Sequence, residues 1–111
     1  MGRVLFVAGL LMMVTGASAF AANDGVGNPG FGKGLANQLC GDCHIVSPDQ
    51  QFSGGRLGPN LVERARDPEI TELALRSYLR TTHPVMPNIM LTQQQTDDII
   101  AYLLTFKASA R

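Results

Sequence analysis

Apolar positions recur with helical spacing in the second half of the chain. From residue 67 onward, five side chains three and four positions apart predict one apolar helix face: Ile70, Leu73, Ala74, Tyr78 and Leu79. Asp67-Pro68-Glu69 supplies a capping acid, a proline at the first helical position and an acid in the first turn, with Thr71 as an alternative cap. We expect His83-Pro84 to end this helix, because a residue before proline is pushed out of the helical region.

A further helix is predicted to begin after Thr92. Thr92-Gln93-Gln94-Gln95 is a capping box, in which the hydroxyl caps the helix start and the glutamine three residues later binds back. Lys107 stands near its C-terminal end, where the helix dipole favours a cation. Its apolar face is predicted to consist of Ile99, Ile100, Leu103, Leu104 and Phe106.

The first half of the chain predicts one more helix, around Gly32 to Cys40, and a loop from Ser47 to Gly58, where turn residues gather. Strands are not indicated, because apolar and polar residues nowhere alternate with a sustained period of two. The fold class expected is therefore all-α, with about three main helices.

Residues 1–21 have the three parts of a secretory signal. Arg3 is followed by an apolar run from Val4 to Val14 and by small residues that end at Ala21, where we expect cleavage. The run is too short for a membrane span, which needs roughly 20 residues. The sequence thus predicts a cleaved signal peptide, residues 1–21, export to the periplasm, and a single mature domain, residues 22–111.

Composition narrows the function. The 111 residues carry 9 basic and 9 acidic side chains, a net charge of +0, so nucleic acid is not an expected partner. Beyond the predicted signal, the residues that favour transition-metal chemistry are few: Cys40, Cys43, His44, His83, Met86 and Met90.

The motif Cys40-Gly41-Asp42-Cys43-His44 concentrates this chemistry. On a helix both sulfurs would share a face, which suits two thioether bonds to one porphyrin and an adjacent imidazole directed at its iron. A thioredoxin-like redox pair would need a strand context that is not indicated, zinc would need four ligands, and a disulfide here would close a very short loop. Covalent haem is the favoured interpretation.

The sequence resembles the small bacterial class I c-type cytochromes, with one haem ligated by histidine and methionine. The resemblance runs from about Gly30 to Lys107 and rests on ordered segments: the Cys40–His44 motif, Gly58-Pro59-Asn60-Leu61, Met86-Pro87-Asn88 and the final helix from Asp98 to Leu103. It implies three helices packed around one haem c that is bound covalently through Cys40 and Cys43.

The resemblance also implies roles for single residues. His44 would be the first axial ligand, and the Pro59 carbonyl would accept a hydrogen bond from its free ring N–H. Gly32 would let the first and last helices cross closely beside Tyr102. Ala36 departs from the pattern, because many relatives carry an aromatic residue there; we expect Phe31, Leu35 or Leu39 to fill the space.

For the sixth ligand the resemblance favours Met86, in its Met-Pro-Asn turn. Met90 is more simply explained as core filler. His83 would make a bis-histidine centre, but we expect it to cap helix carbonyls or contact solvent. An open position is the remaining alternative.

The function implied is a periplasmic one-electron carrier that cycles between Fe(III) and Fe(II), not an enzyme. It would be a monomer, and its partners would be redox proteins such as a dehydrogenase, an oxidase or a respiratory complex. The alternative is a peroxidase-like enzyme or gas sensor with an open or labile sixth position, in which His83 is the available acid-base residue.

Overall fold

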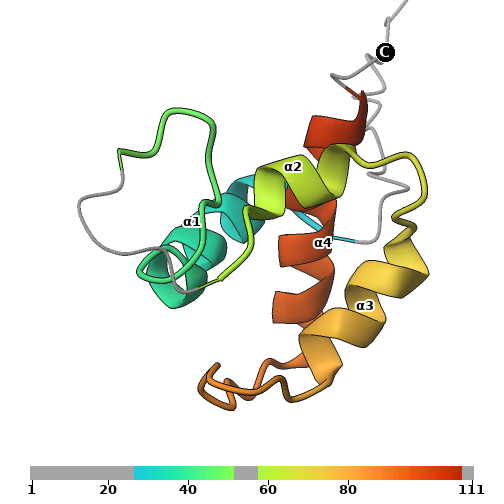
Figure 1. The fold of residues 1–111 in the computed structure, drawn as a ribbon. Coiled ribbons are helices and arrows are strands. Elements are labelled where there is room, and N and C mark those ends of the chain that lie inside the picture. Colours follow the sequence, from blue (N-terminus) through green and yellow to red (C-terminus); the bar gives the residue numbers. More distant parts are fainter. Residues whose placement is uncertain (1–26, 52–57, 109–111) are drawn as a thin grey trace, which may run out of the picture.

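The computed structural model describes residues 27–51 and 58–108. They form four helices: α1 (Pro29–Cys40), α2 (Leu61–Arg66), α3 (Glu72–Arg80) and α4 (Gln93–Ala108) (Figure 1). No strand occurs within these ranges, so the predicted all-α class is confirmed, with one helix more than expected. The predicted signal peptide, residues 1–21, lies outside the described residues.

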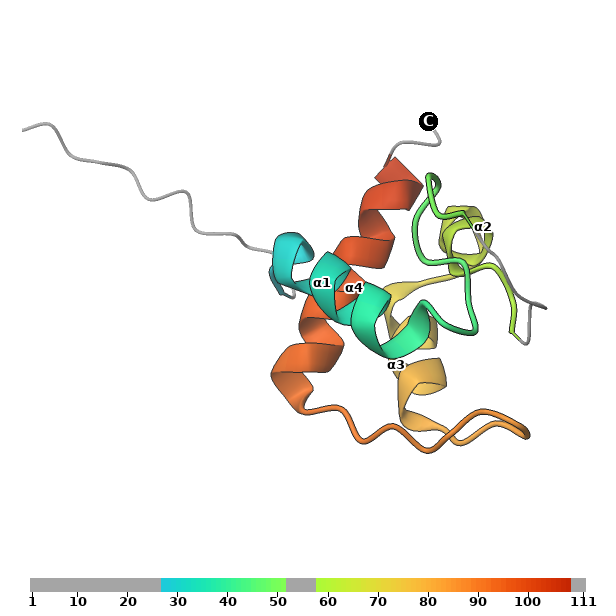
Figure 2. The ribbon, with the colours of Figure 1, turned by 90° about the vertical axis from the view of Figure 1, so that its left-hand side faces the viewer.

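The crossing of α1 and α4 is the centre of the fold (Figure 2). The two helices make the most extensive contact between any pair of elements in the described chain. Gly32 lies directly against the backbone of Asp98 and the Cβ of Tyr102, with no room for a side chain of its own. The predicted close approach at Gly32 is therefore confirmed.

Ala36 is also fully buried at this crossing, with 0% of its surface exposed. Phe31 does not fill the space of the missing aromatic residue, because it is 70% exposed. Leu35 and Leu39 instead pack against the core. Ala36 is thus part of the buried core, and of the three residues expected to fill the space, Leu35 and Leu39 remain.

Local hydrogen bonds explain where α1 and α4 begin. Asn28 Oδ1 accepts from the N–H groups of Gly30, at 2.9 Å, and Phe31, at 3.2 Å, and so caps α1. The predicted capping box of α4 is confirmed: Gln95 N–H donates to Thr92 Oγ1 at 3.2 Å, and Thr92 N–H donates to Gln95 Oε1 at 2.9 Å.

The start predicted for the middle helix is wrong, and a short helix before it was missed. α2 begins after Asn60, whose Oδ1 accepts from Val62 N at 3.0 Å and Glu63 N at 3.2 Å. Asp67 ends α2 and accepts from Glu69 N at 2.9 Å, so it forms a turn rather than a helix start. Thr71, the alternative cap, is the one used: its Oγ1 accepts from Ala74 N at 3.1 Å.

The apolar face predicted for α3 is also partly wrong. Leu73 is 75% exposed and Tyr78 is 60% exposed, whereas Leu75 is the buried residue of this helix. Arg76 tethers the polar side of α3 to α4 through Asp97, with a nitrogen to oxygen distance of 2.6 Å. This tether and the burial of Leu75 set the helix rotation, which local periodicity left undetermined.

The far end of α4 is held by Lys107. Its Nζ donates to the carbonyls of Pro68, at 3.0 Å, and Ile70, at 2.5 Å. These bonds tie the C-terminal turn of α4 to the connection between α2 and α3. Nowhere in residues 27–51 and 58–108 does a helix have the length and apolar character required to cross a membrane.

Candidate functional site

The two cysteines and the histidine of the motif lie at the end of α1. Cys40 is the last helical residue, and its carbonyl accepts from the N–H groups of Cys43, at 3.1 Å, and His44, at 2.9 Å. The turn therefore continues the helical path beyond the end of α1. Cys40 is buried, Cys43 is partly exposed, and the two thiols are not joined as a disulfide.

The environment of this motif does not favour the alternatives to haem. Burial, and secondarily the neighbouring Cys43, raises the pKa of the Cys40 thiol. A redox-active pair requires the opposite shift, because the thiolate is the reactive form. Within the described chain, no three side chains among His, Cys, Asp and Glu are grouped so that they could hold a metal ion alone.

His44 is fixed by two residues of the segment that precedes α2. Its Nδ1 lies 2.8 Å from the carbonyl oxygen of Pro59, the partner that the resemblance implied. The imidazole packs on Gly58 so closely that any Cβ on Gly58 would overlap the ring. His44 is only 7% exposed. A carbonyl can only accept, so this contact requires a proton on Nδ1, and Nε2 is the ring nitrogen that remains for a metal ligand bond.

Backbone bonds hold the two segments together. Gly58 N–H donates to the carbonyl of Cys43 at 3.1 Å, and Leu61 N–H donates to that of Ile45 at 2.9 Å. The start of α2 is thereby attached to the residues on both sides of His44. This attachment explains how residues 58–61, of which the resemblance had placed Pro59 beside the histidine, come to lie there.

A large cavity opens beside the motif. Three adjoining lobes of about 340, 330 and 350 Å³ all border on Cys40, His83 and Met86. His44 and Pro59 line two of these lobes. The third lobe has a mainly aliphatic wall that includes Leu61, Leu75, Leu79 and Leu103. This space suits a large, mostly apolar ligand. Side chains from two segments of the chain would supply the donor atoms that bind its metal.

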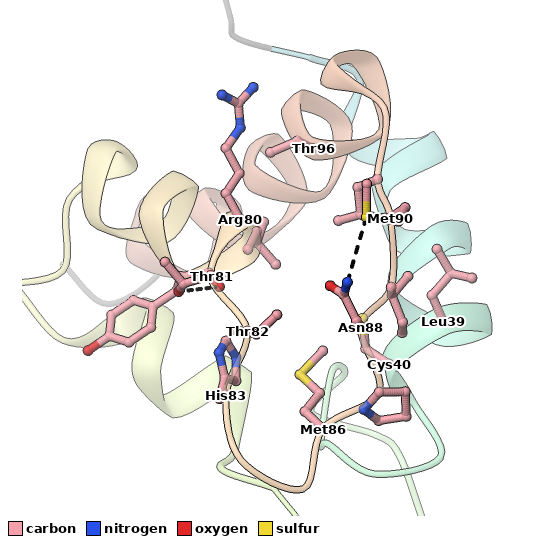
Figure 3. A pocket seen from close by; sticks show the side chains of 15 residues that line it. Leu39, Cys40, Arg80, Thr81, Thr82, His83, Met86, Asn88, Met90 and Thr96 are labelled. Atoms are coloured by element: carbon pink, nitrogen blue, oxygen red, sulfur yellow. Dashed lines mark hydrogen bonds between the residues drawn. The ribbon is translucent and has the colours of Figure 1, made fainter.

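The segment after α3 encloses the other side of the cavity. Figure 3 shows the Met86 thioether and the His83 ring entering the cavity from this segment, with Leu39 and Cys40 of α1 nearby. Met86 N–H donates to the His83 carbonyl at 3.3 Å, which forms a tight turn before the methionine. Met86 is half-buried, as a residue that faces a cavity should be.

The core position expected for Met90 is wrong, and of the two roles expected for His83, helix cap or solvent contact, the cap is not observed. Met90 is not core filler: it is 83% exposed, and within the described residues its sulfur accepts only from Asn88 Nδ2, at 3.8 Å. His83 does not cap α3, because Thr81 Oγ1 donates to the last carbonyls of that helix, those of Ser77 at 3.1 Å and Tyr78 at 3.3 Å. The His83 side chain faces the cavity instead.

Sequence reasoning also missed Val85. This residue has a φ of 74°, in the left-handed region that a β-branched residue rarely adopts. Its side chain is 90% exposed, so packing does not compensate for the strained backbone. Val85 directly precedes Met86, which lines the cavity. The sequence holds no signal for it, since valine is an unexpected residue at such a turn.

The comparison with known proteins agrees with this geometry. The chain is 31% identical over 94 residues to a protein named cytochrome c-552 from Bradyrhizobium diazoefficiens, and the match covers 85% of each chain. No protein-family model matches the chain, and no solved structure is significantly similar to it.

The chain therefore belongs to the c-type cytochromes, in their monohaem class I group. It carries one haem c, attached through Cys40 and Cys43. The described residues fit this group, because the motif and Met86 border one cavity with an aliphatic wall, and Gly58 leaves room for the His44 ring.

Proposed function

We propose that this cytochrome is a one-electron carrier of the periplasm, with His44 and Met86 as the axial ligands of the haem iron. The observation that carries the proposal is that both side chains line the same cavity, although they come from separate segments of the chain. His44 follows the attachment cysteines, and Met86 belongs to the segment between α3 and α4.

The residues of the site account for the chemistry. When bound, haem supplies an iron that takes up one electron from a donor and passes it to an acceptor, as Fe(III) and Fe(II). Pro59 holds the Nδ1 proton of His44, which keeps the imidazole oriented and increases its basicity. A thioether from Met86 favours the ferrous state compared with a second imidazole. With both positions occupied, a substrate has no place on the iron.

Charge and exposure indicate how the carrier meets its partners. The net charge of +0 and the presence of only two lysines, Lys33 and Lys107, predict weak electrostatic steering. Val85 and Met90, which are 90% and 83% exposed, offer apolar contacts beside the cavity. We propose a monomer that docks redox proteins there, with no nucleic-acid partner and with weakly salt-dependent association rates.

Residues 1–21 support the proposed location. Their pattern of a cation, a short apolar run and small residues is that of a signal peptide cleaved after Ala21. Residues 22–111 then form the exported single domain. The proposed location also agrees with the haem attachment. Free thiols rarely persist in an oxidising compartment, and Cys40 and Cys43 are not free once they are bonded to the haem.

Optical spectra of the exported, haem-loaded protein test the axial ligands. We expect a weak near-infrared band of methionine-to-iron ligation in the oxidised form and no response of the reduced form to carbon monoxide. Met86→Ala should abolish the band and admit carbon monoxide. Met90→Ala, which removes an exposed thioether from the same segment, should change neither result.

One observation supports a second candidate, a peroxidase-like enzyme or gas sensor. The His83 side chain borders all three lobes of the cavity and forms no hydrogen bond within the described chain. It is therefore placed to serve as a distal acid-base group if Met86 leaves the iron. Ready binding of carbon monoxide to the unmutated protein would favour this candidate over the carrier.

A further inference from the structure

Gln50 binds the main chain of the haem-attachment motif with both ends of its amide. Its Oε1 accepts from the Val46 N–H at 2.8 Å. Its Nε2 donates to the carbonyl of Gly41 at 2.9 Å and to that of His44 at 3.1 Å. One side chain therefore joins the turn between the two cysteines, the histidine itself and the residues that follow.

The main-chain carbonyls around His44 are all hydrogen-bonded. Four successive carbonyls, from Cys43 to Val46, are each bound by a different group. The donors, in order, are Gly58 N–H at 3.1 Å, Gln50 Nε2 at 3.1 Å, Leu61 N–H at 2.9 Å and Tyr102 Oη at 2.8 Å. Backbone amides hold the first and third of these. The carbonyl of His44 is held only by Gln50 among the described residues.

We infer that Gln50 is a positioning residue for the axial His44. This inference rests on the proposed ligation by His44. The direction of the imidazole depends on the main chain of His44, because its Nδ1 must stay 2.8 Å from the Pro59 carbonyl while the ring packs on Gly58. Gln50 holds that main chain through the His44 carbonyl, whereas Gly58 and Leu61 bind the carbonyls on either side of it.

Loss of the Gln50 amide should loosen this arrangement in a defined way. The carbonyls of Gly41 and His44 would lose a donor, and the Val46 N–H would lose its acceptor. The Nδ1–H bond to Pro59 would then lengthen or bend, and the imidazole would become a weaker electron donor to the iron. A weaker donor stabilises Fe(III) less, so the reduction potential should rise.

Two variants distinguish the effect of the accepting Oε1 of Gln50 from the effect of its donating Nε2. Gln50→Met keeps the length of the side chain and removes all three bonds. Gln50→Glu keeps an oxygen for the Val46 N–H but cannot donate to the carbonyls of Gly41 and His44. Gln51→Met is the matched control, because Gln51 is the next residue, is exposed, and forms no hydrogen bond described in the structure.

The test uses the exported, haem-loaded protein and three readouts: hydrogen exchange of the Val46 N–H, the hyperfine-shifted proton signals of the His44 ring, and the reduction potential. Gln50→Met should speed Val46 exchange about five- to tenfold, move the His44 signals and raise the potential. Gln50→Glu should leave Val46 exchange nearly unchanged while the His44 signals still move. Gln51→Met should change none of the three.

The outcomes that overturn the inference are distinct. If Gln50→Met speeds Val46 exchange but leaves the His44 signals and the potential like those of Gln51→Met, Gln50 only ties the loop and does not position His44. If Gln50→Met fails to fold, Gln50→Glu decides the question by the His44 signals alone: signals like those of Gln51→Met would overturn the inference. If the unmutated protein shows no hyperfine-shifted imidazole signals, the axial role of His44 is wrong, and the inference falls with it.

Discussion

Gly32 on α1 lies directly against the carbonyl of Asp98 on α4, so that no side chain fits between the two helices at this point. Two hydrogen bonds to the Asp98 carboxylate, one from the start of α1 and one from within α4, accompany this contact. Asn28 N–H donates to Asp98 Oδ1 at 2.7 Å, and Gln94 Nε2 donates to the same oxygen at 2.9 Å. The crossing of α1 and α4 therefore combines close backbone packing with a buried carboxylate that holds the helix start.

The Gly32 contact predicts opposite effects for the same substitution at two positions of α1. Gly32→Ala would force a methyl group into the Asp98 backbone and should destabilise the protein by roughly 1–3 kcal/mol. A Cβ on Gly34 would meet no atom within 4 Å. Gly34→Ala should stabilise the protein by about 0.5–1 kcal/mol, because alanine costs less entropy in a helix.

Urea denaturation of the haem-loaded variants measures both effects. If Gly32→Ala were as stable as Gly34→Ala, the two helices would not approach each other in solution as closely as described.

The contact between Gly58 and the His44 ring predicts a change in redox properties. In Gly58→Ala the new methyl group would displace the imidazole and disturb its 2.8 Å bond to Pro59. A less basic imidazole should give a higher reduction potential, together with a stability loss of roughly 1–3 kcal/mol. Potentiometric titration checks the first effect, with Gly34→Ala as a glycine control that should keep the original potential.

Val85 predicts a stabilising substitution in the turn before Met86. Its φ of 74° is unfavourable for a β-branched residue, whereas asparagine tolerates the left-handed region. Because the side chain is 90% exposed, Val85→Asn loses little packing and should stabilise the protein by about 1 kcal/mol.

Val85→Ala is the control for this turn, because alanine lacks the branch but remains strained at a positive φ. Thermal unfolding should rank Asn above Ala. The reverse order would show that Val85 does not adopt a left-handed conformation in solution.

The two lysines predict unequal contributions to stability. Lys107→Met removes the bonds from Nζ to Pro68 and Ile70 and should cost about 1 kcal/mol, because these bonds join the end of α4 to the connection between α2 and α3. Lys33→Met removes an exposed cation that forms no described hydrogen bond and should change stability by less than about 0.5 kcal/mol. Equal losses in urea denaturation would contradict the tether.

Sequence alone was most successful where the physical cause is local. The capping box at Thr92 needs only four consecutive residues, and the spacing within Cys40–His44 is a property of one turn. The apolar face of α4 was found for the same reason, since its long periodic stretch includes the buried residues Ile99, Ile100 and Leu103. Short signals were less decisive: Asp67 and Thr71 both resemble caps, and only Thr71 begins a helix.

Tertiary structure decided which apolar side chains are buried and where the site residues lie. Leu73 and Leu75 are chemically alike, but only Leu75 faces the interior, because α3 is rotated by its contacts with α4. Met90 is exposed for a similar reason, since the segment before α4 lies at the mouth of the cavity.

The sequence by itself therefore determined the helical class, the cap of α4 and the residues able to bind haem, because each depends on neighbours within about one helical turn. The contact of Pro59 with His44 was implied only by the resemblance to known cytochromes, and only the tertiary structure showed the bonds of Gln50 to the attachment motif and of Tyr102 to the Val46 carbonyl across 56 positions of the chain. Contacts between residues far apart in the sequence depend on how the helices and loops pack together. Local helix propensity does not determine that packing.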